Sequence, residues 1–293
     1  MMNTRLCFVI LVCALSFPLV ANGQGLNTSP VDQVLGRSGQ KTGDIYKVSF
    51  PRTDLHVSVN QVLVKAGLAL GSWAAFSGSD ENATVMGDLV LLETEVDPVM
   101  DKLHSAGFEI TAVHNHLMNE TPHILYMHYM GHGSATQLAT SLKAALAASK
   151  TPLEKPAAAA EEPTPPAWVK SVEDSVGRKG TFKGGVLSYG VARADQITMD
   201  GMTIPPVAGV AESINFQEAG TGKVATTGDF VLTASEVNPV IAELRSHEIF
   251  VTALHSHMLT EQPRLFFMHF WAVGSPEVVG GGIKAALSRV SVK

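Results

Sequence analysis

Two histidine-rich motifs with the same spacing, 141 residues apart, are the part of this sequence best suited to chemistry. Each motif has two histidines two positions apart, then a glutamate, then a third histidine. The members are His114, His116, Glu120 and His128 in the first motif and His255, His257, Glu261 and His269 in the second. Imidazole and carboxylate groups bind zinc, iron, manganese, nickel and copper. The motifs therefore predict divalent transition-metal sites, in which Glu120 and Glu261 would act as ligands or as general bases.

The spacing also predicts how each motif folds. Residues 109–117 and 124–129 are typical of two strands joined by a turn, which would form a β-hairpin. Residues two apart on a strand share a face, so His114 and His116 would project together. Pairing across the hairpin would place His128 opposite His114, with the Cβ atoms about 5 Å apart. We therefore expect three imidazoles to converge in each module.

Two other interpretations of the histidines stay open at this stage. Histidines on a half-buried strand can bind a sugar or a small anion through hydrogen bonds. Two copies can also keep a structural polar network that they inherited from one ancestor. His123 and His132 have no histidine counterpart in the second copy, so we place them outside the cluster. If one copy has lost its site, we expect it to be the second, and the sequence does not decide whether the protein is an enzyme.

Four further residues of the first copy are candidates for ligand binding: Arg52, Asp54, Trp73 and Asp88. An Arg–Asp pair such as Arg52 and Asp54 is more often a structural ion pair than a binding site. Trp73 suits either core packing or stacking on a sugar. Asp88, which recurs as Asp229, follows a glycine and either ends a turn or lines a pocket.

The repeat extends far beyond the histidines. Residues 87–128 align without a gap on residues 228–269, and 18 of these 42 positions are identical by direct comparison. A period this long indicates a duplicated domain, whereas solenoid repeats are much shorter. We expect four segments: a signal peptide at 1–24, a first module at 25–150, an Ala/Pro/Glu-rich linker at 151–166 and a second module at 167–293.

Each module is predicted to be α+β. Residues 46–50 alternate as a strand does, and residues 89–92 form a short apolar strand. Apolar residues recur at helical spacing from Val96 to Leu103, with Thr94 as the candidate N-cap, and residues 134–148 form an amphipathic helix. Together with the histidine hairpin, this gives several strands followed by a β-α-β-β-α portion. That order predicts a mainly antiparallel sheet with helices on one side.

Composition and targeting limit the classes of function. The net charge is −6 without a long basic run, so we expect no nucleic-acid partner. Residues 1–24 resemble a signal peptide, which predicts a secreted or periplasmic protein with no integral membrane span after cleavage. Both cysteines, Cys7 and Cys13, lie in that segment, and a large residue precedes Cys13, so we expect neither disulfides nor a lipid anchor. The expected partner is an unknown small molecule or cell-envelope ligand.

Several of these motifs together resemble one known family. Gly71-Ser72-Trp73, Met86-Gly87-Asp88, Glu95-Val96-Asp97-Pro98, the His114 motif and Met127-His128 resemble the LppY/LpqO family of exported bacterial proteins. That resemblance implies export and a bacterial source, and it brings no established activity. The spacing of His114, His116 and Glu120 is also similar to the first metal motif of cupins, which we take as a chemical analogy and not as evidence of fold.

Overall fold

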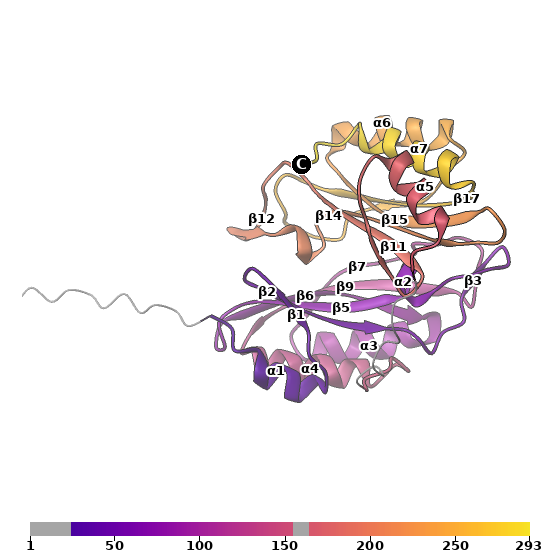
Figure 1. The fold of residues 1–293 in the computed structure, drawn as a ribbon. Helices are drawn as coiled ribbons and strands as arrows, with labels where there is room; N and C mark the ends of the chain where they lie inside the picture. Colours follow the sequence, from indigo (N-terminus) through magenta and orange to yellow (C-terminus); the bar gives the residue numbers. More distant parts are fainter. Residues whose placement is uncertain (1–24, 155–163) are drawn as a thin grey trace, which may run out of the picture.

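The structure is a computed structural model that describes residues 25–154 and 164–293. The predicted signal peptide and most of the predicted linker lie outside the described residues. The two repeats form two modules that lie face to face, with their sheets toward each other and most of their helices on the outer surfaces (Figure 1). The prediction of two α+β modules with antiparallel sheets is confirmed.

The first module is built on a six-stranded antiparallel sheet in the order β1-β2-β5-β6-β9-β7. Its strands are β1 (Gln40–Thr42), β2 (Ile45–Pro51), β5 (Gly71–Gly78), β6 (Ala83–Leu92), β7 (Glu109–His114) and β9 (Ile124–Gly133). Its outer helices are α1 (Thr28–Leu35), α3 (Glu93–Ser105) and α4 (Ala135–Leu146). The short elements are α2 (Ala66–Ala69) and a small sheet of β3 (Ser58–Val59), β4 (Val62–Leu63) and β8 (Glu120–Thr121).

The second module repeats this plan with a sheet in the order β10-β11-β14-β15-β17-β16. Its strands are β10 (Thr181–Lys183), β11 (Val186–Ala192), β14 (Ala211–Glu218), β15 (Val224–Leu232), β16 (Phe250–His255) and β17 (Phe266–Gly274). Its helices are α5 (Ala167–Val176), α6 (Ala234–Ser246) and α7 (Pro276–Leu287). A small hairpin of β12 (Ile197–Met199) and β13 (Met202–Ile204) leads into a 3₁₀ turn, η1 (Pro206–Ala208).

A glutamate carboxylate caps α3 in the first module and α6 in the second. For α3, the sequence had suggested a different residue as the cap. Helix α3 begins at Glu93, so the expected N-cap, Thr94, already lies inside it. The Glu95 carboxylate accepts a hydrogen bond from the Leu92 N–H at 2.9 Å, and the Glu236 carboxylate of α6 accepts one from Thr233 N–H at 2.7 Å. Both carboxylates satisfy an amide that the helix itself leaves free.

Two separate cores lie between the sheets and their outer helices, and two further clusters join the modules. Val90 and Tyr126 of the first sheet pack with Ala225 and Trp271 of the second in one cluster. In the other, Met130 of the first module packs with residues of the second, including Met199, Val231 and Phe267. Burial of apolar surface on the inner faces therefore holds the two sheets together.

Polar contacts also cross between the modules. The Gln217 side chain donates to Leu63 C=O at 2.7 Å and accepts from the Lys65 N–H at 2.9 Å. The Thr252 hydroxyl donates to the His116 carbonyl oxygen at 2.5 Å. These bonds help to fix the position of one module on the other, and the Thr252 bond does so at a motif histidine. Within the described residues, we find no helix that is both long and apolar enough to span a membrane.

Candidate metal centre

The six motif histidines of both modules meet between the two sheets. Each of the three closest ring pairs joins one module to the other. The centroid distances are 3.8 Å for His114–His255, 3.6 Å for His116–His269 and 3.8 Å for His128–His257. When each histidine is replaced by its counterpart 141 positions away, the last two pairs change places and the first pair stays the same. The cluster therefore has pseudo-twofold symmetry, with the axis passing between His114 and His255.

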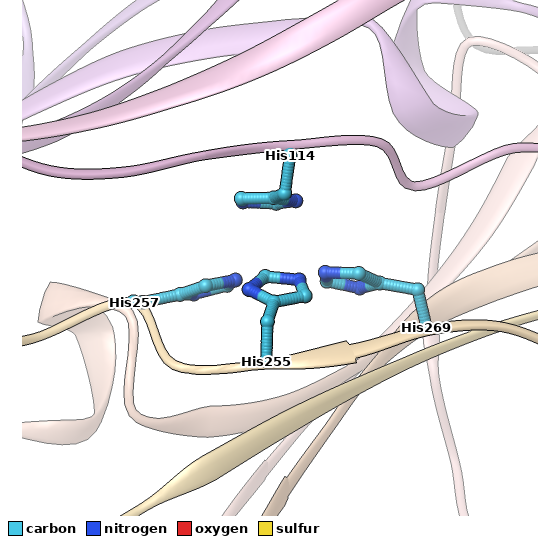
Figure 2. Close-up of side chains that lie close together, drawn as sticks. All are labelled: His114, His255, His257 and His269. Atoms are coloured by element: carbon cyan, nitrogen blue, oxygen red, sulfur yellow. The ribbon is translucent and has the colours of Figure 1, made fainter.

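Four of these histidines come close enough to share one ion. His114, His255, His257 and His269 each offer one ring nitrogen, and these nitrogens lie within 4.8 Å of one another. Figure 2 shows the four rings, with His114 entering from the first module and the other three from the second. A second group with the same spacing consists of His116, Asp229 and His269. Both groups take ligands from both modules.

This arrangement differs from a separate three-histidine set in each module. All three histidines of the second motif belong to the four-histidine group, which His114 completes. Among the described residues, His114, His116 and His128 do not form such a group by themselves. The expectation that the second copy would be the one to lose its site stays a prediction.

The hairpin register places the histidines, and it differs from the expected one. His114 pairs with Tyr126, whereas His128 pairs with Ala112, so direct pairing of His114 with His128 was wrong. The pairing is shifted by two residues, and side chains alternate with a period of two, so both histidines keep the same face. Strands β7 and β16 end at His114 and His255, and each contains a register shift two to four residues earlier.

Two aspartates stand beside the histidines on the neighbouring strands. Asp88 pairs directly with His128 across β6 and β9, and Asp229 pairs in the same way with His269 across β15 and β17. An Asp229 carboxylate oxygen lies 2.5 Å from His269 Nδ1 and 3.6 Å from His116 Nδ1. The Asp88 oxygen lies 3.8 Å from His128 Nε2. The structure thus brings the predicted residue Asp88, and its counterpart Asp229, into the cluster.

The surroundings of five of the cluster histidines favour the neutral imidazole. Burial, followed by repulsion between neighbouring rings, lowers the pKa of His114 and of the more deeply buried His116, His128 and His257. Burial also lowers the pKa of His255 to about 4. Burial and the nearby charge of Asp229 raise the pKa of Asp88 well above its ordinary value. A neutral imidazole has the lone pair that a metal needs.

The ring nitrogens that would face an ion are free of other partners. Nδ1 of His114 lies 3.3 Å from its neighbour's carbonyl oxygen, and Nδ1 of His255 does the same. A carbonyl only accepts, so these Nδ1 atoms carry the proton and Nε2 keeps its lone pair. Among the described residues, Nε2 of all six histidines is buried without a hydrogen-bond partner. Unpartnered buried nitrogens are costly in a fold, and a bound ion would satisfy them.

The two glutamates of the motifs lie in the hairpin loops and outside both ligand groups. Glu120 pairs with His123 Nδ1 at 2.6 Å and accepts from the Ile124 N–H at 3.4 Å. Glu261 accepts from the Leu265 N–H at 2.9 Å and pairs with Arg264 at 3.3 Å. These bonds explain why both carboxylates are buried. Their role as ligands or bases stays a prediction.

The Arg52–Asp54 pair is satisfied within the fold. The Arg52 guanidinium is fully buried, and it donates to Asp54 at 2.8 Å, to Glu95 at 2.7 Å and to the Val90 carbonyl at 2.7 Å. The second module repeats this arrangement around Arg193. Such a network joins strand, loop and helix in each module. These contacts support the structural interpretation of the pair.

Trp73 lies next to the centre, in a position that the second module fills differently. It pairs with Asp88 across the sheet, whereas Ser213 occupies the equivalent place opposite Asp229. The Lys47 ammonium lies 3.9 Å from the centre of the Trp73 ring, and a Cβ added to Gly209 would lie 3.2 Å from that ring. The indole is thus packed between a lysine and a backbone segment. Lys47 is a neighbour of the cluster that the sequence did not reveal, because its counterpart in the second module is a serine, Ser188.

Two cavities adjoin the cluster. The methionine-lined cavity has a volume of about 240 Å³ and contains Met86, Met130, Met199 and Met258 beside His128 and His257. The polar cavity has a volume of about 520 Å³ and contains Ser213, Asn215 and Thr227 beside His116 and Tyr126. Lys47, Trp73, Asp88 and Asp229 line both cavities. The centre is therefore reached by space suited to a small molecule.

Comparison with known proteins identifies the repeated module. The profile of a family described as Domain of Unknown Function (DUF1259) matches residues 29–148 and again residues 170–289. No curated protein matches the chain. One solved structure, a trimeric bacterial microcompartment shell protein PduB, is similar at 10% identity, covering 86% of this chain and 89% of that one, with a TM-score of 0.20. A score this low carries no argument about fold or function.

Proposed function

This chain belongs to the family of the Domain of Unknown Function (DUF1259), and from the geometry of its histidines we propose that its two modules together form one centre for a divalent transition metal. One observation carries the proposal. Four imidazoles from both modules, His114, His255, His257 and His269, present ring nitrogens within 4.8 Å of one another. An ion with bonds of about 2.0–2.1 Å to nitrogen needs only a small inward movement of these rings.

The composition of the group favours particular metals. Imidazole suits zinc, copper, nickel and iron, whereas magnesium and calcium prefer an all-oxygen site. The nearby pair of His116 and Asp229 offers a carboxylate as well, which suits zinc, iron and manganese. A bound ion would act as a Lewis acid on a molecule that enters from either cavity. If the protein is an enzyme, hydrolytic and oxidative reactions are the classes to test.

The metal content of the purified chain tests this function. We expect near-stoichiometric metal, measured by mass spectrometry after reconstitution at neutral pH and removal of excess ion. His114→Ala should weaken binding although the three histidines of the second module are intact. The matched control is His104→Ala, which removes an exposed histidine from α3. Absence of metal from the unmodified chain, or full retention in His114→Ala, would contradict a composite centre.

A non-catalytic module that binds a cell-envelope glycan or small ligand is the alternative. It predicts ligand binding without metal, which the same samples can test by calorimetry. We also propose, from the sequence alone, that the chain is exported after cleavage of residues 1–24 and that it is of the LppY/LpqO type. Localisation of the full-length protein by cell fractionation tests the first of these two statements.

A further inference from the structure

The two cavities beside the centre are pseudo-symmetric counterparts that differ in chemistry. The histidines and aspartates of the cluster recur in both modules, but the residues around them do not. Thr227 of the polar cavity corresponds to Met86 of the methionine-lined cavity, because each residue directly precedes the Gly-Asp pair that both modules share. What differs between the copies therefore determines what each cavity can bind.

Lys47 brings a positive charge to the polar cavity. Its counterpart in the second module is Ser188, so the cluster has one such lysine, and Lys47 lines both cavities. The ammonium lies over Trp73 and donates to the carbonyl of Val207, a residue of the methionine-lined cavity, at 3.3 Å. Among the described residues, Lys47 forms no ion pair within 4.0 Å. Burial lowers the pKa of Lys47 to about 8, and the charges of Asp88 and Asp229 oppose that effect. A buried cation without an ion-pair partner is a binding group for an anion.

Thr227 is a second, independent sign of a ligand. Its side chain is 1% exposed and lines the polar cavity. Its hydroxyl is buried without a hydrogen-bond partner among the described residues, although the neighbouring Thr226 hydroxyl donates to the Asn215 carbonyl oxygen at 2.9 Å. A buried hydroxyl without a partner costs free energy unless a ligand or water satisfies it. Ser213 and Asn215 add further polar groups to the lining of this cavity, and Ser213 also lines the other one.

The charges around the cavity favour one added anion once a metal is bound. The five histidines whose pKa is lowered by burial contribute no charge, Asp88 and Asp229 contribute two negative charges at most, and Lys47 contributes one positive charge. A divalent ion then leaves a net positive charge in a buried space. An anion that enters the cavity neutralises this charge, and a low dielectric strengthens its attraction.

We propose that the polar cavity binds a small oxyanion, a carboxylate or a phosphate, held by Lys47 and Thr227 beside the metal centre. The anion accepts hydrogen bonds from the Lys47 ammonium and the Thr227 hydroxyl, and its other end faces the metal ion near His116. This inference rests on the proposed function, because the metal supplies the positive charge that the anion neutralises. The methionine-lined cavity has Met86 in the position that corresponds to Thr227, and it takes no such ligand.

Calorimetric titration of the metal-loaded chain with acetate, lactate and inorganic phosphate tests the inference. We expect at least one of these probes to bind, and the comparison between them separates a carboxylate site from a phosphate site. Lys47→Met keeps the aliphatic stem and should weaken binding by at least about tenfold, since a hydrogen bond to a charged group is lost. Thr227→Val keeps the shape and should weaken binding by about fivefold.

The controls are Lys41→Met, an exposed lysine on β1, and Thr140→Val, an exposed threonine on α4. Metal content is measured on every sample first, and circular dichroism checks that each variant is folded. Retained metal with weaker probe binding in both cavity variants supports the inference. Bound metal with no probe binding, or with equal binding in all variants, overturns it and leaves the proposed function standing. A chain that binds no metal overturns both.

Discussion

The ring of His114 lies against that of His255, with centroids 3.8 Å apart, although the two residues belong to different modules. They are equivalent positions of the two repeats, so each is the pseudo-symmetric partner of the other. This contact makes the interface between the modules the place where chemistry can occur. It also means that a change in either module should alter a single shared centre.

The third histidines of the two motifs, His128 and His269, should not be equivalent in metal binding. His269 belongs to both groups of closely spaced ligand atoms, whereas His128 belongs to neither. We expect His269→Ala to weaken metal binding much more than His128→Ala does. Competition with a metal-sensitive dye measures both affinities. Equal losses in the two variants would show that the ion occupies a more symmetric position.

Asp229 should tune the metal even if it is not a ligand. Its carboxylate oxygen lies 2.5 Å from His269 Nδ1, and its negative charge would stabilise a cation bound to that ring. Asp229→Asn should therefore lower metal affinity by about 10–100-fold. The matched change is Asp88→Asn, whose carboxylate is 3.8 Å from His128 and should have a smaller effect. An effect of Asp88→Asn that equals or exceeds that of Asp229→Asn would refute this assignment.

The metal-free protein should lose stability as the pH falls through the range of histidine protonation. The pKa of His255 is about 4 in the folded chain and about 6.5 in an unfolded one, and burial lowers that of four other cluster histidines. Between these two pKa values the unfolded chain binds more protons than the folded chain does. The stability that the neutral histidines contribute is therefore complete above about pH 6.5 and is lost toward pH 4. The raised pKa of Asp88 acts in the opposite direction.

Urea denaturation of the metal-free chain between pH 7.5 and 4.5 measures this dependence. His255→Asn should flatten the slope, because it removes one group whose pKa differs between the folded and unfolded states. A stability that is constant over the whole range would show that the cluster histidines are not buried as neutral rings. Because added metal competes with protons for the rings, metal should shift the loss of stability to lower pH.

Gly87 should not tolerate a side chain. A Cβ at this position would lie 2.2 Å from the Tyr129 hydroxyl and 2.4 Å from the Trp73 carbonyl oxygen. Gly87→Ala therefore forces β5 and β9 apart next to Asp88, and overpacking of this kind costs about 1–3 kcal/mol. We expect a lower urea midpoint together with weaker metal binding. Gly190→Ala is the control, because nothing lies within 4 Å of its added Cβ.

Arg52→Met should reduce the free energy of unfolding without removing the metal site. It leaves Glu95 largely buried without its guanidinium partner, and loss of one member of a buried pair costs about 3–5 kcal/mol. The partial exposure of Asp54 places the expected loss at the low end of that range. Arg289→Met, which breaks an exposed pair with Glu243, should cost less than about 1 kcal/mol. Equal losses would contradict a structural role specific to Arg52.

Local patterns in the sequence determined much of the module. Alternation and helical spacing predicted strands and helices because these periods reflect which side chains share a face. The 141-residue repeat predicted two equivalent α+β units, and the spacing of His114, His116 and His128 predicted a shared face. The prediction of a shared face holds although the predicted pairing of His114 with His128 was wrong, because a shift of two residues leaves both side chains on the same face of the sheet.

The tertiary structure alone decided how those units combine. Packing of the two inner sheet faces depends on apolar surface from strands far apart in the sequence, such as those that carry Val90 and Trp271. That packing turns two hairpins into one cluster, leaves Glu120 and Glu261 in their own loops, and brings Lys47 next to the aspartates. No local period records which sheet will cover another, because the contacts that decide it are long-range.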